Sequence, residues 1–269
     1  MNFSTITFQE PQPGIGLLTL NRPERLNALN MAMLDDLQAL FQSLMPRTDV
    51  RVIILTGAGR GFCSGADLKD TRRLNDPSFP GYTSPGGHLV HIQKKYADRV
   101  LEMRHLPQPI IAAVNGPAAG GGMCLALASD VVIAGEAAAF TPSFINIGLS
   151  GGELGTSYFL PRAVGFPRAA EILMTGRTVN AEEAERIGLV SKKVPGEVLM
   201  AAAMETATQM LAKSPMGLRF TKEALNFNID APSLHAAIEL ENRNQSICCF
   251  SPEFLAAVQA FQKRNSPGS

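Results

Sequence analysis

The stretch PIIAAVNGPAAGGG spans residues 109–122 and leads from an apolar run directly into a cluster of glycines. An apolar run of this length is typical of a buried strand, and the LALA segment at 125–128 should be helical. Glycine permits left-handed turns and a close approach of the backbone to a ligand. A helix start also carries N–H groups without partners and partial positive charge. The stretch therefore predicts either a tight turn packed against a neighbouring element or a site for an anion or a developing oxyanion.

The same combination occurs earlier in the chain, where the apolar run VIILTG at 52–57 precedes the glycine-containing loop AGRGFCSGAD at 58–67. If the two strands are neighbours, two backbone N–H groups from these loops can point at one carbonyl oxygen, which is an oxyanion hole. Phe62 stands where the last glycine of a GxGxxG dinucleotide fingerprint would be, so that fingerprint fails. Neither glycine segment contains GK followed by Ser or Thr, so a Walker-type phosphate loop is poorly supported.

The composition describes a chain able to form a large core. Its 269 residues are 45% hydrophobic and 18% charged, which suits one large soluble domain or one domain with a small appendage. The 24 basic and 24 acidic residues balance, so neither a nucleic acid nor a membrane surface is an expected partner. Small molecules and sister subunits are expected instead.

The four cysteines show no CxxC spacing, which favours reduced thiols in a cytoplasmic protein over a disulfide framework. The first 14 residues lack a basic segment followed by an apolar core, and no later run approaches about 18 apolar residues. We therefore expect neither secretion nor a membrane span.

The order of patterns along the chain predicts a strand-rich core followed by a helical part. Alternating stretches at 4–9 and 15–20 predict a hairpin or neighbouring strands, and Asn30 is a candidate N-cap for the helix that follows it. Prolines and glycines between Thr71 and Gly87, without apolar periodicity, predict a mobile surface loop. The other predicted elements are helices over 31–44 and 89–106, strands over 51–57, 109–116, 130–135 and 138–144, and mainly helices beyond about residue 148.

Several segments, in order and over most of the chain, resemble the crotonase superfamily, that is, the enoyl-CoA hydratase/isomerase family. The matching segments are NRPERLNALN (21–30), VRVIILTGAGRGFCSGADL (50–68), PIIAAVNGPAAGGG (109–122), SDVVIAGEAAAF (129–140), LPRAVG (160–165), RAAEILMTGR (168–177) and AEEAERIGLV (181–190). The resemblance implies an α/β fold with a ββα spiral core over 1–195 and a helical oligomerisation region over 196–269. It also implies a homotrimer or a homohexamer built as a dimer of trimers.

The resemblance also implies a site for an acyl-CoA thioester. Ala66 and Gly121 would donate backbone N–H groups to the thioester carbonyl, whose oxygen gains negative charge during the reaction. Coenzyme A would enter as part of the substrate, and neither a separate cofactor nor a metal is implied. Lys263 also suits a solvated surface charge. The residues predicted to contact the substrate are Arg25, Ala28, Ala66, Asp67, Leu68, Gly121, Phe144 and Lys263.

The sequence departs from the family where hydratases carry two glutamates that activate water. Cys124 occupies the first of these positions and Phe144, by ungapped matching, the second, and neither can act as a carboxylate base. A buried structural thiol is the favoured interpretation of Cys124 over a nucleophile. His88 and His91 have the spacing of paired metal ligands but lack a nearby third donor.

Glu153 is the acid that remains near these positions, and other branches of the family carry an aspartate at about this place. It is the predicted general acid/base, although a carboxylate that merely stabilises a helix start is the alternative. One carboxylate suits proton transfer better than addition of water, so the predicted reaction is isomerisation of an enoyl-CoA. The alternatives are hydration or acyl-CoA hydrolysis with a non-standard site, and a noncatalytic acyl-CoA-binding protein.

Overall fold

The computed structural model describes residues 2–70 and 85–264, and its centre is a six-stranded sheet. The strand order is β1-β2-β3-β4-β6-β9; β1 and β2 form an antiparallel hairpin, and the other neighbours are parallel. Its strands are β1 (Ile6–Gln12), β2 (Ile15–Leu20), β3 (Val52–Gly57), β4 (Ile110–Val114), β6 (Val131–Gly135) and β9 (Lys192–Val194). The predicted hairpin and the predicted apolar strands are therefore confirmed.

The strands β3 and β4 are direct parallel neighbours, as the oxyanion-hole hypothesis requires. Their carboxyl ends therefore lie at the same edge of the sheet, and the glycine-containing loops leave from that edge. A small second sheet, with the strand order β5-β7-β8, involves the segment between β4 and the glycine cluster. Its strands are β5 (Pro117–Ala119), β7 (Ala139–Thr141) and β8 (Val179–Asn180), of which only β7 was predicted.

Helices cover both faces of the large sheet, which explains why every residue of β3 and β4 is buried. Ile53 and Leu55 join a core with α1 (Met31–Leu44) and α2 (Pro85–His105), whereas Val52 and Ile54 pack on the opposite face with α7 (Leu199–Leu211). The predicted cap is confirmed, because the side chain of Asn30 accepts a hydrogen bond from the first turn of α1.

The predicted loop over 71–87 is wrong at its end, because α2 begins at Pro85. Proline is favoured in the first turn of a helix, where its missing N–H is not needed. Residues 71–84 lie outside the described part of the chain, and the prediction for them stays a prediction.

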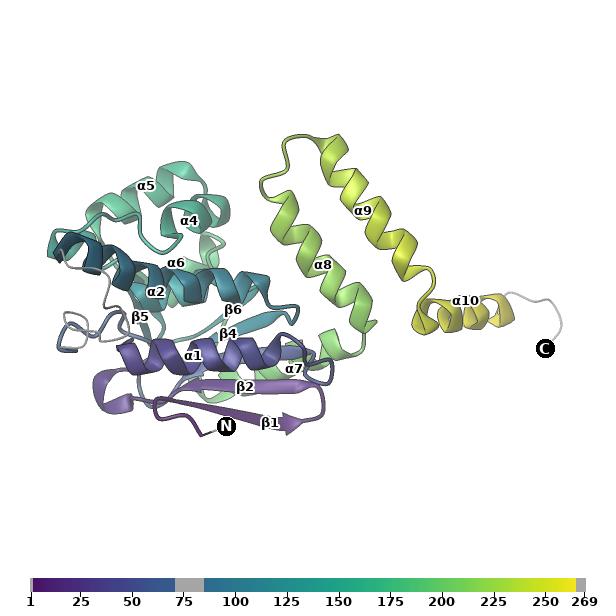
Figure 1. Cartoon of the computed structure of the whole chain (residues 1–269), viewed down its shortest axis with the longest axis horizontal. Helices are drawn as coiled ribbons and strands as arrows, with labels where there is room; N and C mark the ends of the chain where they lie inside the picture. Colours follow the sequence, from purple (N-terminus) through teal and green to yellow (C-terminus); the bar gives the residue numbers. More distant parts are fainter. Residues whose placement is uncertain (1, 71–84, 265–269) are drawn as a thin grey trace.

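The remaining helices follow the predicted helical pattern, and the last three extend away from the sheet (Figure 1). We call α8, α9 and α10 the C-terminal arm. These helices are α3 (Gly121–Ala128), α4 (Thr156–Val164), α5 (Phe166–Thr175), α6 (Ala181–Arg186), α8 (Pro215–Asn228), α9 (Leu234–Cys248) and α10 (Pro252–Arg264). The predicted division at 195/196 stays a prediction, but α7 packs on the sheet and the arm begins only at α8. Within the described residues, no helix combines the length and apolar character needed to cross a lipid bilayer.

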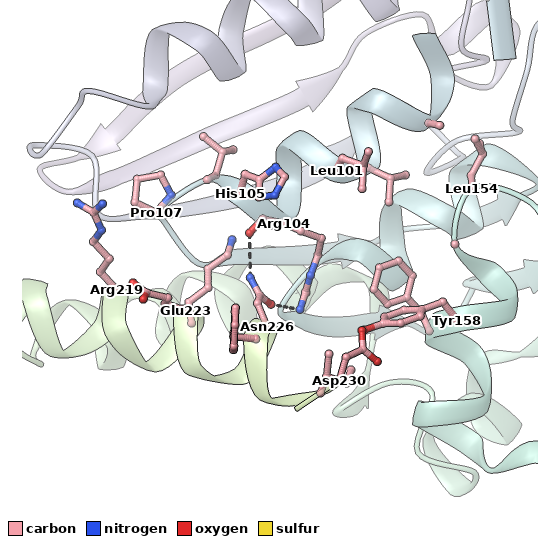
Figure 2. A pocket seen from close by; sticks show the side chains of 18 of the residues that line it. Leu101, Arg104, His105, Pro107, Leu154, Tyr158, Arg219, Glu223, Asn226 and Asp230 are labelled. Carbon is pink, nitrogen blue, oxygen red and sulfur yellow. Dashed lines mark hydrogen bonds between the residues drawn. The ribbon is translucent and has the colours of Figure 1, made fainter. Parts of the chain in front are cut away.

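The arm is attached to the core through polar contacts between α8 and the end of α2. The ammonium of Lys222 is buried, donates to the carbonyls of Met103 and Gln108 at 3.1 and 2.8 Å, and pairs with Asp130 at 2.9 Å. Arg104 and Asn226 face each other beside this contact and exchange hydrogen bonds between α2 and α8 (Figure 2). A buried ammonium without such partners would be costly, so these bonds fix where the arm leaves the core.

Candidate active site

The loop after β3 is fixed by two isolated β-bridges, Leu29 with Ala66 and Cys63 with Ala118. The Leu29 N–H donates to the Gly65 carbonyl at 2.7 Å, and the Leu29 carbonyl accepts from the Asp67 N–H at 2.9 Å. Because Leu29 bonds to the residues on either side of Ala66, the N–H of Ala66 itself points away from Leu29. The bridge thus leaves that N–H available on the other side of the loop.

The glycines allow this loop and the start of α3 to touch. Gly65 has a φ of +89°, and a Cβ added there would lie 2.8 Å from the Ala119 carbonyl oxygen and 3.1 Å from the Gly121 nitrogen. A Cβ on Gly122 would lie only 2.0 Å from the Cys63 carbonyl oxygen. Gly121 is the first residue of α3, so its N–H has no partner within the helix. The sequence left open whether these glycines allow close packing or provide a helix start with an N–H group that has no helical partner. The structure shows both features at these glycines.

A cavity of about 160 Å³ opens at this junction and contains most of the predicted site residues. Ala66, Gly121 and Glu153 all line it, as do the predicted contacts Leu68 and Phe144. The full lining is Ser64, Gly65, Ala66, Leu68, Gln93, Tyr96, Gly120, Gly121, Ser143, Phe144, Ile147, Leu149, Glu153 and Leu154. The structure therefore brings together two candidate oxyanion donors and a candidate base.

A larger cavity of about 780 Å³ lies between α2, α4 and α8 (Figure 2). It meets the smaller cavity at Leu154, which lines both, but Ala66, Gly121 and Glu153 are not among its lining residues. Its polar groups are largely engaged in attaching the arm, as Lys222 and Asn226 illustrate. The larger volume would favour this cavity as the active site. The smaller cavity is the better candidate, because the two candidate N–H donors and the Glu153 carboxylate line it.

Glu153 lies before α4 and is held at both its backbone and its side chain. Its N–H donates to the Thr156 hydroxyl at 3.0 Å, and that hydroxyl donates to the Glu153 carbonyl at 2.8 Å. Its Oε1 accepts a hydrogen bond from Gln93 Nε2 at 2.7 Å. The N-cap of α4 is Gly155, and its first turn contains no acidic residue. Glu153 thus lies two residues before the N-cap, and both its catalytic role and the helix-start alternative stay predictions.

Cys124 and Phe144, which replace the hydratase glutamates, are both buried. The Cys124 thiol lies 3.2 Å from the Gly120 carbonyl oxygen and 3.6 Å from that of Glu153, so it acts as a donor between the two loops. Burial, and secondarily the charge of Glu153, raises the pKa of Cys124 well above its ordinary value. The ring of Phe144 lies over Gly120, where an added Cβ would be 3.3 Å from it. These observations agree with a structural thiol rather than a nucleophile.

Alkylation of the native protein at pH 8 is expected to leave Cys63 and Cys124 unmodified. Both are fully enclosed, and burial raises the pKa of Cys63 to about 12, so the reactive thiolate is scarce. Treatment with iodoacetamide before and after unfolding in urea, followed by peptide mass spectrometry, measures this. Rapid native labelling of Cys124 would revive the nucleophile interpretation, and the same reagent should modify all four cysteines after unfolding.

The other described residues predicted to contact the substrate do not line the smaller cavity. Arg25 and the buried Ala28 belong to the loop that precedes α1. The Asp67 carboxylate accepts a hydrogen bond from Arg22 at 2.9 Å. Burial alone would raise the pKa of Asp67, but the bonds from Arg22 and the Lys69 N–H lower it overall. Substrate contacts by these residues stay predictions.

Lys263 belongs to α10 and His88 to α2, but their side chains are outside the described part of the structure. Among the described residues, no group of three His, Cys, Asp or Glu side chains could hold a metal ion. Sequence reasoning missed Gln93, Tyr96 and Thr156. Gln93 and Tyr96 lie on one face of an ordinary helical pattern, and nothing in that pattern indicates which later loop they meet.

The family of the chain follows from its similarity to known proteins. A family model described as enoyl-CoA hydratase/isomerase matches residues 10–268. The chain belongs to the enoyl-CoA hydratase/isomerase family. It is 43% identical over 265 residues to the probable enoyl-CoA hydratase EchA12 of Mycobacterium tuberculosis, with 98% of this chain and 92% of that protein covered.

The family includes relatives with different reactions. This chain is 36% identical to the 1,2-epoxyphenylacetyl-CoA isomerase of Escherichia coli, with 95% of each protein covered. The crystal structure of a probable enoyl-CoA hydratase/isomerase from Mycobacterium abscessus matches with a TM-score of 0.89 and 38% identity, covering 99% of this chain and 98% of that one. The predicted α/β fold of the crotonase type is therefore confirmed.

Proposed function

We propose that this member of the enoyl-CoA hydratase/isomerase family transfers a proton within an enoyl-CoA thioester, as an isomerase does. The observation that carries the proposal is one cavity lined by Ala66, Gly121 and Glu153. Two N–H groups suit a thioester oxygen that gains negative charge, and one carboxylate suits a proton that leaves one carbon and returns to another. Among the described lining residues, Glu153 supplies the only carboxylate.

The proposed cycle begins when the thioester carbonyl oxygen accepts hydrogen bonds from the N–H groups of Ala66 and Gly121. The Glu153 carboxylate removes a proton from the carbon that the carbonyl activates, and the C–H electrons form an enolate with its charge on the thioester oxygen. The resulting Glu153 carboxylic acid returns the proton to another carbon of the conjugated system. The double bond moves, the carboxylate is restored, and neither a separate cofactor nor a metal is needed.

Hydration is the second candidate, because the M. tuberculosis relative is named a probable enoyl-CoA hydratase. Adding water requires a group that activates the water and a group that protonates carbon. The positions where the family resemblance places two carboxylates hold the buried Cys124 and Phe144 instead. A hydratase or hydrolase would therefore need to use Glu153 alone, which makes isomerisation the better supported proposal.

A panel of enoyl-CoA thioesters, analysed by mass spectrometry with binding measured in parallel, tests the proposal. Isomerisation changes the position of the double bond at constant mass, whereas hydration adds one water and hydrolysis releases coenzyme A. Tight binding without conversion of any thioester would contradict an enzymatic function and favour the noncatalytic acyl-CoA-binding protein.

We also propose that the chain assembles as a homotrimer or homohexamer. The C-terminal arm exposes large apolar side chains, including Leu234 at 77%, Phe250 at 85% and Phe261 at 67% exposure. Apolar side chains gathered on an extended arm favour contact with another subunit, and closed symmetry is the usual outcome. Light scattering at micromolar concentration is expected to give three or six times the chain mass. A stable monomer of about 28.8 kDa would contradict the prediction.

A further inference from the structure

We propose that Gln93 is a positioning residue that holds the Glu153 carboxylate in its working orientation. The proposal rests on the proposed proton transfer by Glu153 and adds the residue that directs it. Gln93 lies on α2 and reaches across to the segment before α4, where its Nε2 donates to Glu153 Oε1 at 2.7 Å. Both side chains line the cavity that contains the candidate oxyanion donors.

The contact adds a bond at the side chain of Glu153 to the bonds that hold its backbone. The buried Thr156 bonds to the N–H and the carbonyl of Glu153, and the Cys124 thiol lies 3.6 Å from the same carbonyl. Those bonds fix the position of the Glu153 backbone. A bond at Oε1 restricts the carboxylate itself, and catalytic groups need to be held within a fraction of an ångström of the productive geometry.

The neutral amide of Gln93 also suits a group that must take up and release the same proton. A cationic partner would stabilise the carboxylate strongly and make it a weaker base. An amide N–H donates to one carboxyl oxygen and can keep that bond when the other oxygen is protonated. Gln93 thus fixes the orientation of the Glu153 side chain both when it is a carboxylate and when it is a carboxylic acid. The bond lowers the basicity of the carboxylate only slightly.

The two lysines that flank Gln93 are engaged with other residues. Lys94 and Lys95, which flank Gln93 on α2, are paired with aspartates at 2.5 and 3.2 Å. The Tyr96 hydroxyl, which faces the cavity region, donates to the Leu29 carbonyl at 3.1 Å, and the Cys124 thiol remains protonated because of its burial. A change at Gln93 should therefore act on Glu153 rather than on one of these groups.

Two variants with opposite expected effects test the proposal. Gln93→Leu removes the donor, so kcat should fall roughly tenfold, the scale of a lost hydrogen bond to a charged group. The acid limb of the kcat profile should move to higher pH, because the carboxylate loses stabilisation. Gln93→Lys supplies a cationic donor and should move the same limb to lower pH. KM should change little in either variant, since the effect concerns the chemical step.

Gln209→Leu is the matched control, because Gln209 makes a similar contact with Glu205 at 3.5 Å on the exposed side of α7. It should leave both kcat and the pH profile unchanged. A purely structural role of Gln93 would lower the amount of folded enzyme without moving the acid limb. An unmoved acid limb in both Gln93 variants, with kcat within about twofold of wild type, would overturn the proposal.

Isomerisation of an enoyl-CoA, measured directly as movement of the double bond, separates this failure from failure of the proposed function. If wild-type enzyme isomerises no enoyl-CoA, or Glu153→Gln isomerises as fast as wild type, the proton-transfer function itself is wrong. If Glu153→Gln stops isomerisation while both Gln93 variants isomerise as wild type does, only the positioning role is wrong.

Discussion

Glu153→Gln is expected to lower turnover of an enoyl-CoA substrate by roughly 10²- to 10⁴-fold, the usual contribution of general acid–base catalysis. Glutamine keeps the size of the side chain and can still bond to Gln93 on α2, which donates to Glu153 Oε1 in the native protein. It cannot accept and return a proton at neutral pH, so the acyl-CoA should still bind while the chemical step is lost. Steady-state kinetics and a parallel binding titration measure the two effects separately.

Glu182→Gln provides the matched control for this prediction. Glu182 is an exposed acid in the first turn of α6, where it interacts favourably with the helix dipole. Removing its charge should cost only about 0.3–1 kcal/mol of stability and leave turnover unchanged. If Glu153→Gln also changed stability by that amount and left turnover intact, Glu153 would have no catalytic role.

The large sheet could be predicted except for β9, because its other strands have recognisable apolar or alternating patterns, whereas β9 is the three-residue segment KKV. The buried strands β3 and β4 are apolar on both faces, and the helix after Asn30 begins with a recognisable cap. The strands of the second sheet are much shorter: β5 has three residues and β8 two. Their pairing depends on contacts between distant segments, so local sequence carries little information about them.

The part of the candidate site that could be predicted is the part formed by local turns at the ends of strands. Ala66 and Gly121 follow two similar strand–loop junctions, and the parallel pairing of β3 and β4 brings these together. Gln93 could not be found in this way, because its contact depends on how α2 crosses a loop 60 residues later. The hydrogen bond from Arg22 to Asp67 likewise depends on the fold. Neither the segment around Arg22 nor the segment around Asp67 has a sequence pattern that predicts it.

Gly121→Pro tests the oxyanion hole directly, because proline removes the N–H and is accepted at the first position of a helix. We expect turnover to fall at least tenfold and up to roughly 10³-fold, the cost of one lost oxyanion donor. The thioester enolate would then lose one of the two hydrogen bonds proposed to stabilise its oxygen. Circular dichroism and light scattering must first establish that the variant keeps its fold and assembly.

Gly121→Ala separates the loss of the N–H from the effect of added bulk. Both variants add a Cβ, which would lie 2.9 Å from Leu29 Cδ1, the end of a side chain that can move slightly. Alanine keeps the N–H, so a true donor predicts a large loss of turnover with proline and a much smaller loss with alanine. Equal losses would assign the effect to crowding against Leu29. An undiminished rate in a folded Gly121→Pro variant would exclude Gly121 as a donor and leave Ala66 to stabilise the enolate alone.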